Sequence, residues 1–380
     1  MRIKYSMVWL AISLMATINV SAQTNKTTTI QKIKLLDVYE IPHNVLYDST
    51  TVGGLSGIEY DAVNDCYYMI CDDRSAINPA RYYTARIKIN QQKIDTVRFT
   101  GVHFLKDEFA QVYPGSKQDR KRTPDPEALR YNPLTQQMIW SSEGERIVNA
   151  KDTVLNNPAI TIIQPNGTWV DTFTLPPNLY MHASENGPRQ NGVLEGMTFA
   201  DNYQTLYVNV EEPLYEDGPK ADLTPNKAFV RLYKFDVATQ KNTAQYAYEL
   251  DPVAYAPIIA GTFKVNGIPD MLDLGNGQLL IIERSFSTGR LACTIKVFTI
   301  NVKGATNIIN NPSLIQNNQF TPVKKQLLLN MDDLGVFTDN IEGVTFGPVL
   351  PNGHPTLLFV ADNNFAAYQR SQFFLFEIIP

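Results

Sequence analysis

A short pattern of apolar and polar positions recurs five times along this 380-residue chain, and each copy predicts a β-strand. Aligned on one apolar residue, the copies lie 71, 68, 75 and 72 residues apart; the aligned residues are Ile58, Leu129, Met197, Leu272 and Val344. A regular period of this kind is typical of an array of similar structural units. Four copies carry a carboxylate two residues before the aligned position, and the exception is Ser56.

A second strand is predicted after each copy, because a short apolar run that ends in charge follows about ten to fifteen residues later. Asn, Asp, Gly and Pro separate each pair, so each unit is expected to open with a β-hairpin. The second strands are expected within residues 68–74, 138–143, 206–212, 279–284 and 357–362. Since a hairpin begins and ends at the same side, the acidic residues of both strands should meet at one rim.

Two more strands follow in most units. Third strands are predicted at residues 82–89, 159–163, 229–237, 294–302 and 373–379, and fourth strands at 95–104, 169–175, 245–250 and 325–330. The last unit lacks a fourth strand, and the strand-like segment 30–41 can take its place. We therefore expect an all-β fold with a single β-propeller of about five four-stranded blades, closed by the N-terminal strand. A sixth blade in the longer connections and an all-β sandwich are the alternatives.

Composition supports one β-rich domain and an exported protein. The chain has 44% hydrophobic residues, 19 Tyr and 18 Phe, without a long amphipathic helical pattern. An apolar stretch at residues 7–20 follows Arg2 and Lys4, and small residues precede cleavage after Ala22, which indicates a signal peptide at 1–22 and a propeller domain at 23–380. A membrane anchor is the alternative, although the stretch is short for a spanning helix. We expect a periplasmic or secreted monomer.

Charge and cysteine content exclude several classes of partner. The net charge of −5 argues against nucleic acid. Three cysteines, Cys66, Cys71 and Cys293, show no metal-binding spacing, and we expect them to be small buried residues. The one basic run, residues 117–122, is either a solvated loop or an arm that attracts anions.

The repeat also predicts a site. In a propeller the first strand of each blade lines the axis, so the motif positions should form a ring at one mouth of the channel; these are Ser56, Glu127, Glu195, Asp270 and Glu342. The ends of the second strands should surround it with Asp72, Asp73, Glu143, Glu211, Glu212, Glu283 and Asp362. Either a hard cation such as Ca²⁺ or nearby arginines must offset this charge. Alternatively, each Glu only accepts backbone N–H groups between blades.

Four segments together resemble one known family: GGLSGI (53–58), PDPEA (124–128), NGVLEGM (191–197) and NIEGV (340–344). They look like the exported phytase-like β-propellers described as having esterase-like activity of phytase, and the resemblance runs from about residue 35 to the end. It implies a Ca²⁺-dependent hydrolase of phosphate esters, in which calcium in an acidic mouth holds both the substrate phosphate and the attacking water.

Roles for individual residues follow as hypotheses. The predicted metal ligands are Glu127, Glu195, Asp270, Glu342, Asp72 and Asp362. Glu143, Glu211 and Glu283 are predicted as further ligands or a general base, and Arg74 and Arg284 as groups that neutralise phosphate. His182 is either an acid or ligand on a rim loop or a plain surface residue. The sequence shows no nucleophilic serine motif.

Three functions remain open at this stage. The first is a calcium-dependent phosphoesterase acting on a small-molecule substrate. The second is a hydrolase of another ester or of a lactone at the same metal site. The third is a non-enzymatic exported binding protein in which calcium only stabilises the fold.

Overall fold

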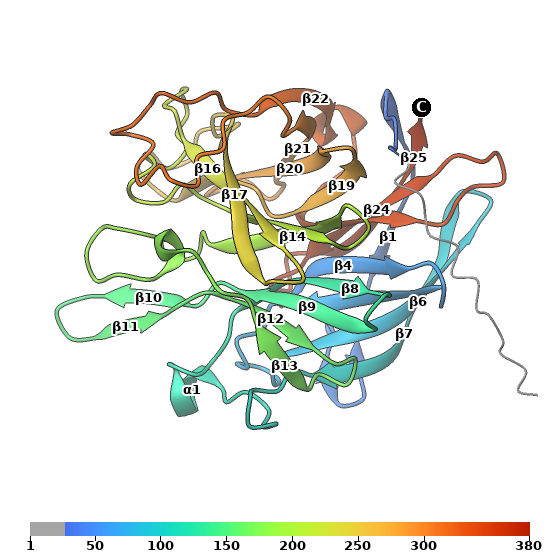
Figure 1. Cartoon of the computed structure of the whole chain (residues 1–380). Coiled ribbons are helices and arrows are strands. Elements are labelled where there is room, and N and C mark those ends of the chain that lie inside the picture. The colour runs from blue at the N-terminus through green and yellow to red at the C-terminus, as the bar shows by residue number, and fades with distance from the viewer. Residues whose placement is uncertain (1–26) are drawn as a thin grey trace, which may run out of the picture.

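The computed structural model describes residues 27–380, which form a five-bladed β-propeller (Figure 1). The first blade contains β4 (Leu55–Asp61), β5 (Cys66–Cys71), β6 (Arg81–Asn90) and β7 (Lys93–Phe104). The second contains β8 (Pro126–Asn132), β9 (Gln137–Ser142), β12 (Ala159–Ile163) and β13 (Trp169–Thr172). The third contains β14 (Leu194–Ala200), β15 (Thr205–Val210), β16 (Phe229–Asp236) and β17 (Lys241–Glu249).

The last two blades vary this plan. The fourth contains β18 (Lys264–Gly267), β19 (Met271–Gly275), β20 (Gln278–Ser287), β21 (Thr294–Asn301) and β22 (Lys324–Asn330). Both β18 and β19 pair with β20, so the inner strand of this blade is interrupted just before Met271. The fifth blade contains β23 (Asn340–Gly347), β24 (Thr356–Asp362), β25 (Ser371–Ile379) and β1 (Lys32–Ile41).

The loops between these strands contain several short elements. They are two small hairpins, β2 (Leu46–Tyr47) with β3 (Thr50–Thr51) and β10 (Glu145–Val148) with β11 (Thr153–Asn156), and the helical turns α1 (Ser116–Asp119), η1 (Pro177–Leu179) and η2 (Met331–Leu334). No helix within residues 27–380 has the length and apolar character needed to cross a membrane.

The N-terminal strand closes the ring as the sequence predicts. β1 pairs antiparallel with β25, from Lys32 opposite Ile379 to Ile41 opposite Ser371. Ile33 is buried in the same apolar cluster as Phe376 of β25, so side-chain packing supports the ladder of hydrogen bonds. This pairing covers the edge of β25, which an open sheet would expose.

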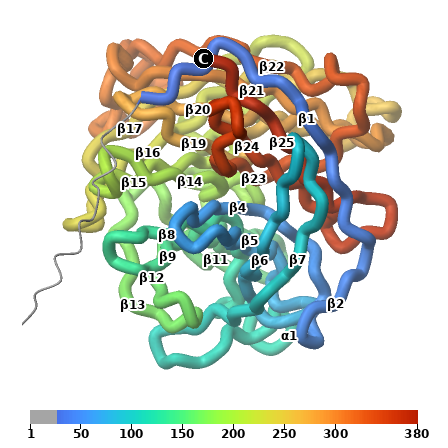
Figure 2. The backbone as a smooth tube through the Cα atoms, turned by 90° about the vertical axis from the view of Figure 1, so that its right-hand side faces the viewer, coloured from blue at the N-terminus to red at the C-terminus, as the bar shows by residue number. Residues whose placement is uncertain are grey.

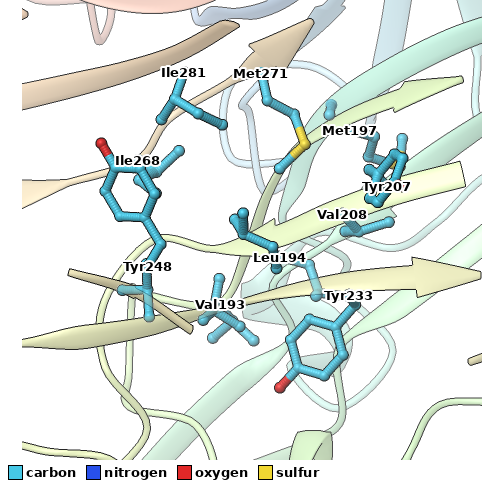
Figure 3. Close-up of a cluster of buried hydrophobic side chains, with 14 of the residues drawn as sticks. Val193, Leu194, Met197, Tyr207, Val208, Tyr233, Tyr248, Ile268, Met271 and Ile281 are labelled. Carbon is cyan, nitrogen blue, oxygen red and sulfur yellow. The ribbon is translucent and has the colours of Figure 1, made fainter. Parts of the chain in front are cut away.

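The five inner strands lie side by side around the axis (Figure 2). Contacts run from β4 to β8, β14, β19 and β23 and back to β4, so the ring is complete. Apolar side chains fill the space between neighbouring blades. Figure 3 shows Leu194 and Val208 of the third blade in one buried cluster with Met271 and Ile281 of the fourth.

Most predicted strands are confirmed to within a few residues, and five blades are confirmed over six. Neither the hairpin β10–β11 nor the strand β18 was predicted: the hairpin lies in the connection between the second and third strands of the second blade, and β18 lies just before the inner strand of the fourth. The predicted signal peptide, residues 1–22, lies outside the described residues.

Candidate metal centre

Each inner strand begins at the same mouth of the ring, and most are irregular at the motif carboxylate. The pairing register shifts between Leu55 and Gly57 in β4, between Pro126 and Leu129 in β8, between Leu194 and Met197 in β14, and between Ile341 and Gly343 in β23. These intervals contain Ser56, Glu127, Glu195 and Glu342. A β-bulge bends the strand and re-aims the side chain at the extra position. The repeat therefore encodes a bulge at the start of four inner strands.

A cluster of eight acidic side chains occupies this mouth. We call it the mouth cluster; its members are Asp72, Asp125, Glu127, Glu143, Glu195, Glu211, Glu342 and Asp362. All but Asp72 and Glu342 are classed as buried, and Glu342 has a side chain that is only 11% exposed. Five of the six residues that we predicted as metal ligands belong to it, as do two of the three predicted acidic catalytic residues, Glu143 and Glu211.

Two carboxylate triads within the cluster have the spacing of a cation site. Asp72, Asp125 and Glu127 each place one oxygen within 4.8 Å of the others, and Glu127, Glu143 and Glu195 do the same. Since Ca²⁺ binds oxygens at about 2.3–2.6 Å, oxygens separated by up to about twice that distance can share one ion. Glu127 belongs to both triads. Ser56 donates a hydrogen bond of 2.9 Å to Glu127 Oε2, so the one motif copy without an acid helps to orient the shared carboxylate.

Most carboxylates of the mouth cluster have raised pKa values, because they are buried and lie close to one another. Desolvation first, and repulsion from neighbouring carboxylates second, raise the pKa of Glu143 from 4.5 to about 7 and that of Asp125 from 3.8 to about 7. The same causes raise the pKa of Glu127, Glu195 and Glu342 well above the ordinary value. Near neutral pH these groups must therefore bind either protons or cations.

Two arginines supply the positive charge that the described residues place among these acids. Arg284 contacts Glu342 at 2.6 Å and also pairs with Glu211. Arg74 contacts Asp125 at 3.1 Å and Glu145 at 3.3 Å. Two guanidinium groups do not balance eight carboxylates. In addition, Asp362 is fully buried, and its Oδ2 has no hydrogen-bond partner among the described residues. An all-oxygen donor set with excess negative charge and a free oxygen fits a hard divalent cation.

Three predicted site residues lie outside the mouth cluster. Both oxygens of Asp270 accept hydrogen bonds from Arg130 Nη2, at 2.6 and 2.7 Å, and the backbone N–H of Val344 donates to it at 2.8 Å. Glu283 accepts from Lys325 at 2.6 Å and from Tyr248 at 2.7 Å. Partners within the fold thus occupy both carboxylates, and we exclude both from the proposed cation site.

His182, the third, lies in the loop that follows η1. Its carbonyl oxygen accepts a hydrogen bond of 2.8 Å from Arg146 Nε, and its side chain lines a separate pocket on the outside of the ring. We therefore give His182 no role at the mouth.

Asp125 and Glu145 were not among the predicted site residues. Asp125 lies two residues before the motif carboxylate Glu127. Its place in the PDPEA segment could have indicated that it lies, like Glu127, near the start of β8. Glu145 opens β10 and receives both Arg74 and Arg120. Two residues of the basic run 117–122 form ion pairs: Arg120 pairs with Glu145, and Arg122 pairs with Asp107.

A β-propeller with a carboxylate-rich mouth that could hold a metal ion is the class of protein that this fold and site define. Residues 50–365 match the family named Phytase-like and described as "Esterase-like activity of phytase". The chain belongs to this family. No curated protein matches it in sequence.

Solved structures show weak similarity to the chain. An exo-β-1,3-galactanase from Clostridium thermocellum has a TM-score of 0.46 and 12% identity, with 89% of this chain and 62% of that chain covered. The periplasmic gluconolactonase of Pseudomonas aeruginosa scores 0.37 with 10% identity, covering 87% and 90%. The soluble aldose sugar dehydrogenase of Escherichia coli scores 0.37 with 10% identity, covering 92% and 100%. Similarities at this level carry no argument about chemistry.

Proposed function

We propose that the mouth cluster binds calcium and that the protein hydrolyses phosphate esters of small molecules. The observation that carries this proposal is the pair of carboxylate triads that share Glu127, set among buried acids that two arginines leave uncompensated. Family membership supports a hydrolase of this type. The excess of negative charge in the mouth cluster favours a bound cation that takes part in the reaction.

The chain offers enough oxygen donors for calcium. Glu127 with Asp72 and Asp125 would hold one ion, and Glu127 with Glu143 and Glu195 would hold another in the adjoining triad. When bound, such ions polarise phosphoryl oxygens and lower the pKa of a bound water molecule.

The residues around the triads have separate tasks in this proposal. Arg284 and Arg74 retain 14% and 23% exposure of their side chains, so both can meet an anionic group that enters from solvent. Glu143 would serve either as a ligand of the second ion or, where no ion is bound there, as a proton acceptor, since its pKa in the ion-free site is about 7. The backbone N–H of Val193 donates to Glu143 Oε1 at 2.6 Å and so fixes the position of this carboxylate.

One observation favours a second candidate, the hydrolysis of another ester or a lactone at the same site. Both arginines of the mouth already pair with carboxylates, so a phosphate group must compete with Glu342 and Asp125 for them. A neutral ester has no such competition.

We further propose that the mature protein is exported after cleavage near Ala22 and acts as a monomer. The basic start, the apolar stretch and the small residues at 20–22 support export.

The test compares the purified mature chain with calcium and with chelator on a generic phosphate ester and a generic carboxylate ester. We expect calcium-dependent phosphate release that Glu195→Gln and Glu342→Gln abolish, with calcium binding followed by calorimetry. Glu249→Gln is the matched control, since Glu249 is an exposed acid on β17. Turnover of the carboxylate ester alone would favour the second candidate. If neither ester is turned over while calcium raises the melting temperature, the protein binds calcium without catalysis.

A further inference from the structure

A second concave site lies outside the ring, away from the mouth cluster. It encloses about 730 Å³. One wall is the segment from Thr174 through η1 to Asn186, which crosses from the second blade to the third and pairs with it at Thr174 opposite Lys241. The opposite wall is the loop 309–312, and β17 forms the floor. This volume is within the usual range of about 300–1,000 Å³ for small-molecule sites.

A buried polar network holds the floor in place. Gln245 is 1% exposed, and its Oε1 accepts hydrogen bonds from Arg231 at 2.8 Å and from Asn178 at 3.1 Å. Arg231 also pairs with Asp217 through two hydrogen bonds of 2.6 and 2.7 Å and donates to the carbonyl oxygen of Asn311 at 2.9 Å. The network joins both walls to the floor. A pocket that is ordered before binding avoids part of the entropy cost of binding a ligand.

One polar atom of the lining lacks a partner. Asn178 donates its side-chain N–H to Gln245, but its Oδ1 is buried and accepts no hydrogen bond from the described residues. An unsatisfied buried acceptor costs about 1–3 kcal/mol, and a ligand hydroxyl or N–H can supply the missing donor. Beside it, the ring of Tyr180 is 39% exposed and offers an apolar face.

The lining favours a neutral ligand over an anion. It is rich in amide side chains and in proline and includes one tyrosine, Tyr180; its charged or titrating groups are His182, Glu216 and Lys241. Glu216 accepts the backbone N–H of Gly187 at 2.7 Å, and burial raises its pKa. None of the described residues that line the pocket is an arginine, the residue that commonly recognises phosphate. Amides suit hydroxyl groups, and aromatic and proline rings suit the apolar face of a sugar ring.

We propose that this pocket binds a neutral saccharide unit, with the Asn178 amide contacting hydroxyl groups and the Tyr180 ring packing against the sugar. The proposal is independent of the chemistry at the mouth, because the two sites share no residue.

The test is calorimetric titration of the full mature chain with a panel of neutral hexasaccharides of glucose, galactose, mannose and xylose. We expect saturable binding of at least one member, weakened at least tenfold by Tyr180→Ala and by Asn178→Ala. Tyr368→Ala is the matched control, since Tyr368 is 76% exposed on the loop after β24. The melting temperature of each variant shows whether it is folded.

Binding should persist in chelator and in Glu195→Gln, which separates this pocket from the mouth. The proposal is overturned if no panel member binds the wild-type chain, or if Tyr180→Ala leaves binding unchanged. Displacement of the bound sugar by inorganic phosphate would also overturn it, because the site would then select anions.

Discussion

At the scale of residues, carboxylates from equivalent repeat positions have different partners. Glu195 lies among other acids in a cation triad, whereas Arg130 holds Asp270 from across the axis. Glu283 has Lys325 beside it, together with the side chain of Asn266 at 2.7 Å. The difference lies in which cation lies beside the carboxylate: Arg130 comes from another blade, and Lys325 from the outer strand β22 of the same blade. Asp270 and Glu283 thus stabilise the fold through these cations, whereas Glu195, which forms no salt bridge with the described residues, is available to a metal ion.

Replacing Glu283 with Gln should therefore lower stability and leave calcium binding unchanged. The change removes the charge that Lys325 and Tyr248 contact in a place that is 1% exposed. We expect a loss of about 1–3 kcal/mol in the free energy of unfolding, measured by denaturant titration. A fall in calcium affinity equal to that of Glu195→Gln would instead place Glu283 in the cation site.

The pair of Arg130 and Asp270 links opposite sides of the ring. Both side chains are 1% exposed, and Arg130 also donates to the carbonyl oxygen of Ile58 at 3.1 Å. Arg130→Met leaves Asp270 as a buried charge without its cation, so we expect a loss of about 3–5 kcal/mol. In a double-mutant cycle, adding Asp270→Asn should recover part of this loss. Strictly additive losses would show that the two side chains do not interact.

At the scale of elements, glycines that directly follow the motif position, Ser56 or Glu195, let the inner strands approach closely. A Cβ atom at Gly196 would lie 2.5 Å from the Cα of Asp270 on the neighbouring blade, and one at Gly57 would lie 3.1 Å from the carbonyl oxygen of Glu127. In these two copies the motif residue that faces the mouth is therefore followed directly by a glycine that contacts the next blade.

Gly196→Ala should destabilise the propeller, because neither backbone can move without disturbing the ring. We expect a loss of about 1–3 kcal/mol in the free energy of unfolding. Gly57→Ala is the graded comparison and should cost less, since its nearest contact is 0.6 Å longer by subtraction of the two distances, 3.1 − 2.5. Equal stability of Gly196→Ala and the wild-type chain would contradict the close packing of β14 on the fourth blade.

At the scale of the whole molecule, the mouth cluster couples stability to pH. The pKa of Asp125 and of Glu143 is about 7 in the folded protein, against 3.8 and 4.5 without the fold. Between those values the folded chain binds more protons than the unfolded chain. Stability contributed by these groups therefore falls as pH rises from about 4.5 to about 7.

We expect the melting temperature of the chelated protein to fall over this pH range and calcium to restore it most strongly at the upper end. Calcium competes with protons for the same oxygens, so its affinity should rise with pH. Scanning calorimetry at several pH values, with and without calcium, measures both effects. Glu195→Gln should show a shallower pH dependence, because it removes one raised pKa. If the chelated wild-type protein instead gains stability between about pH 4.5 and 7, the mouth carboxylates do not have raised pKa values in the folded protein.

Much of the architecture follows from the sequence alone, because it depends on local and periodic features. The spacing of the five motifs, the turn residues and the apolar runs predict five hairpins, and the missing last strand predicts closure by segment 30–41. The hairpins also predict that the acidic residues meet at one rim, since a hairpin ends at the side of the sheet where it began. The four segments that carry the family resemblance all lie within the residues that match the family.

Only the tertiary structure decided which acids share a site. Asp270 and Glu195 occupy equivalent places in the repeat, and the guanidinium group of Arg130 reaches one of them from another blade. Asp125 joins a triad because β8 and the end of β5 meet at the mouth, and the outer pocket exists because segments 174–186 and 309–312 meet over β17. The sequence of this chain determines its strands and their order through local propensity and period. Contacts between distant residues depend on how the closed ring sets its blades against one another.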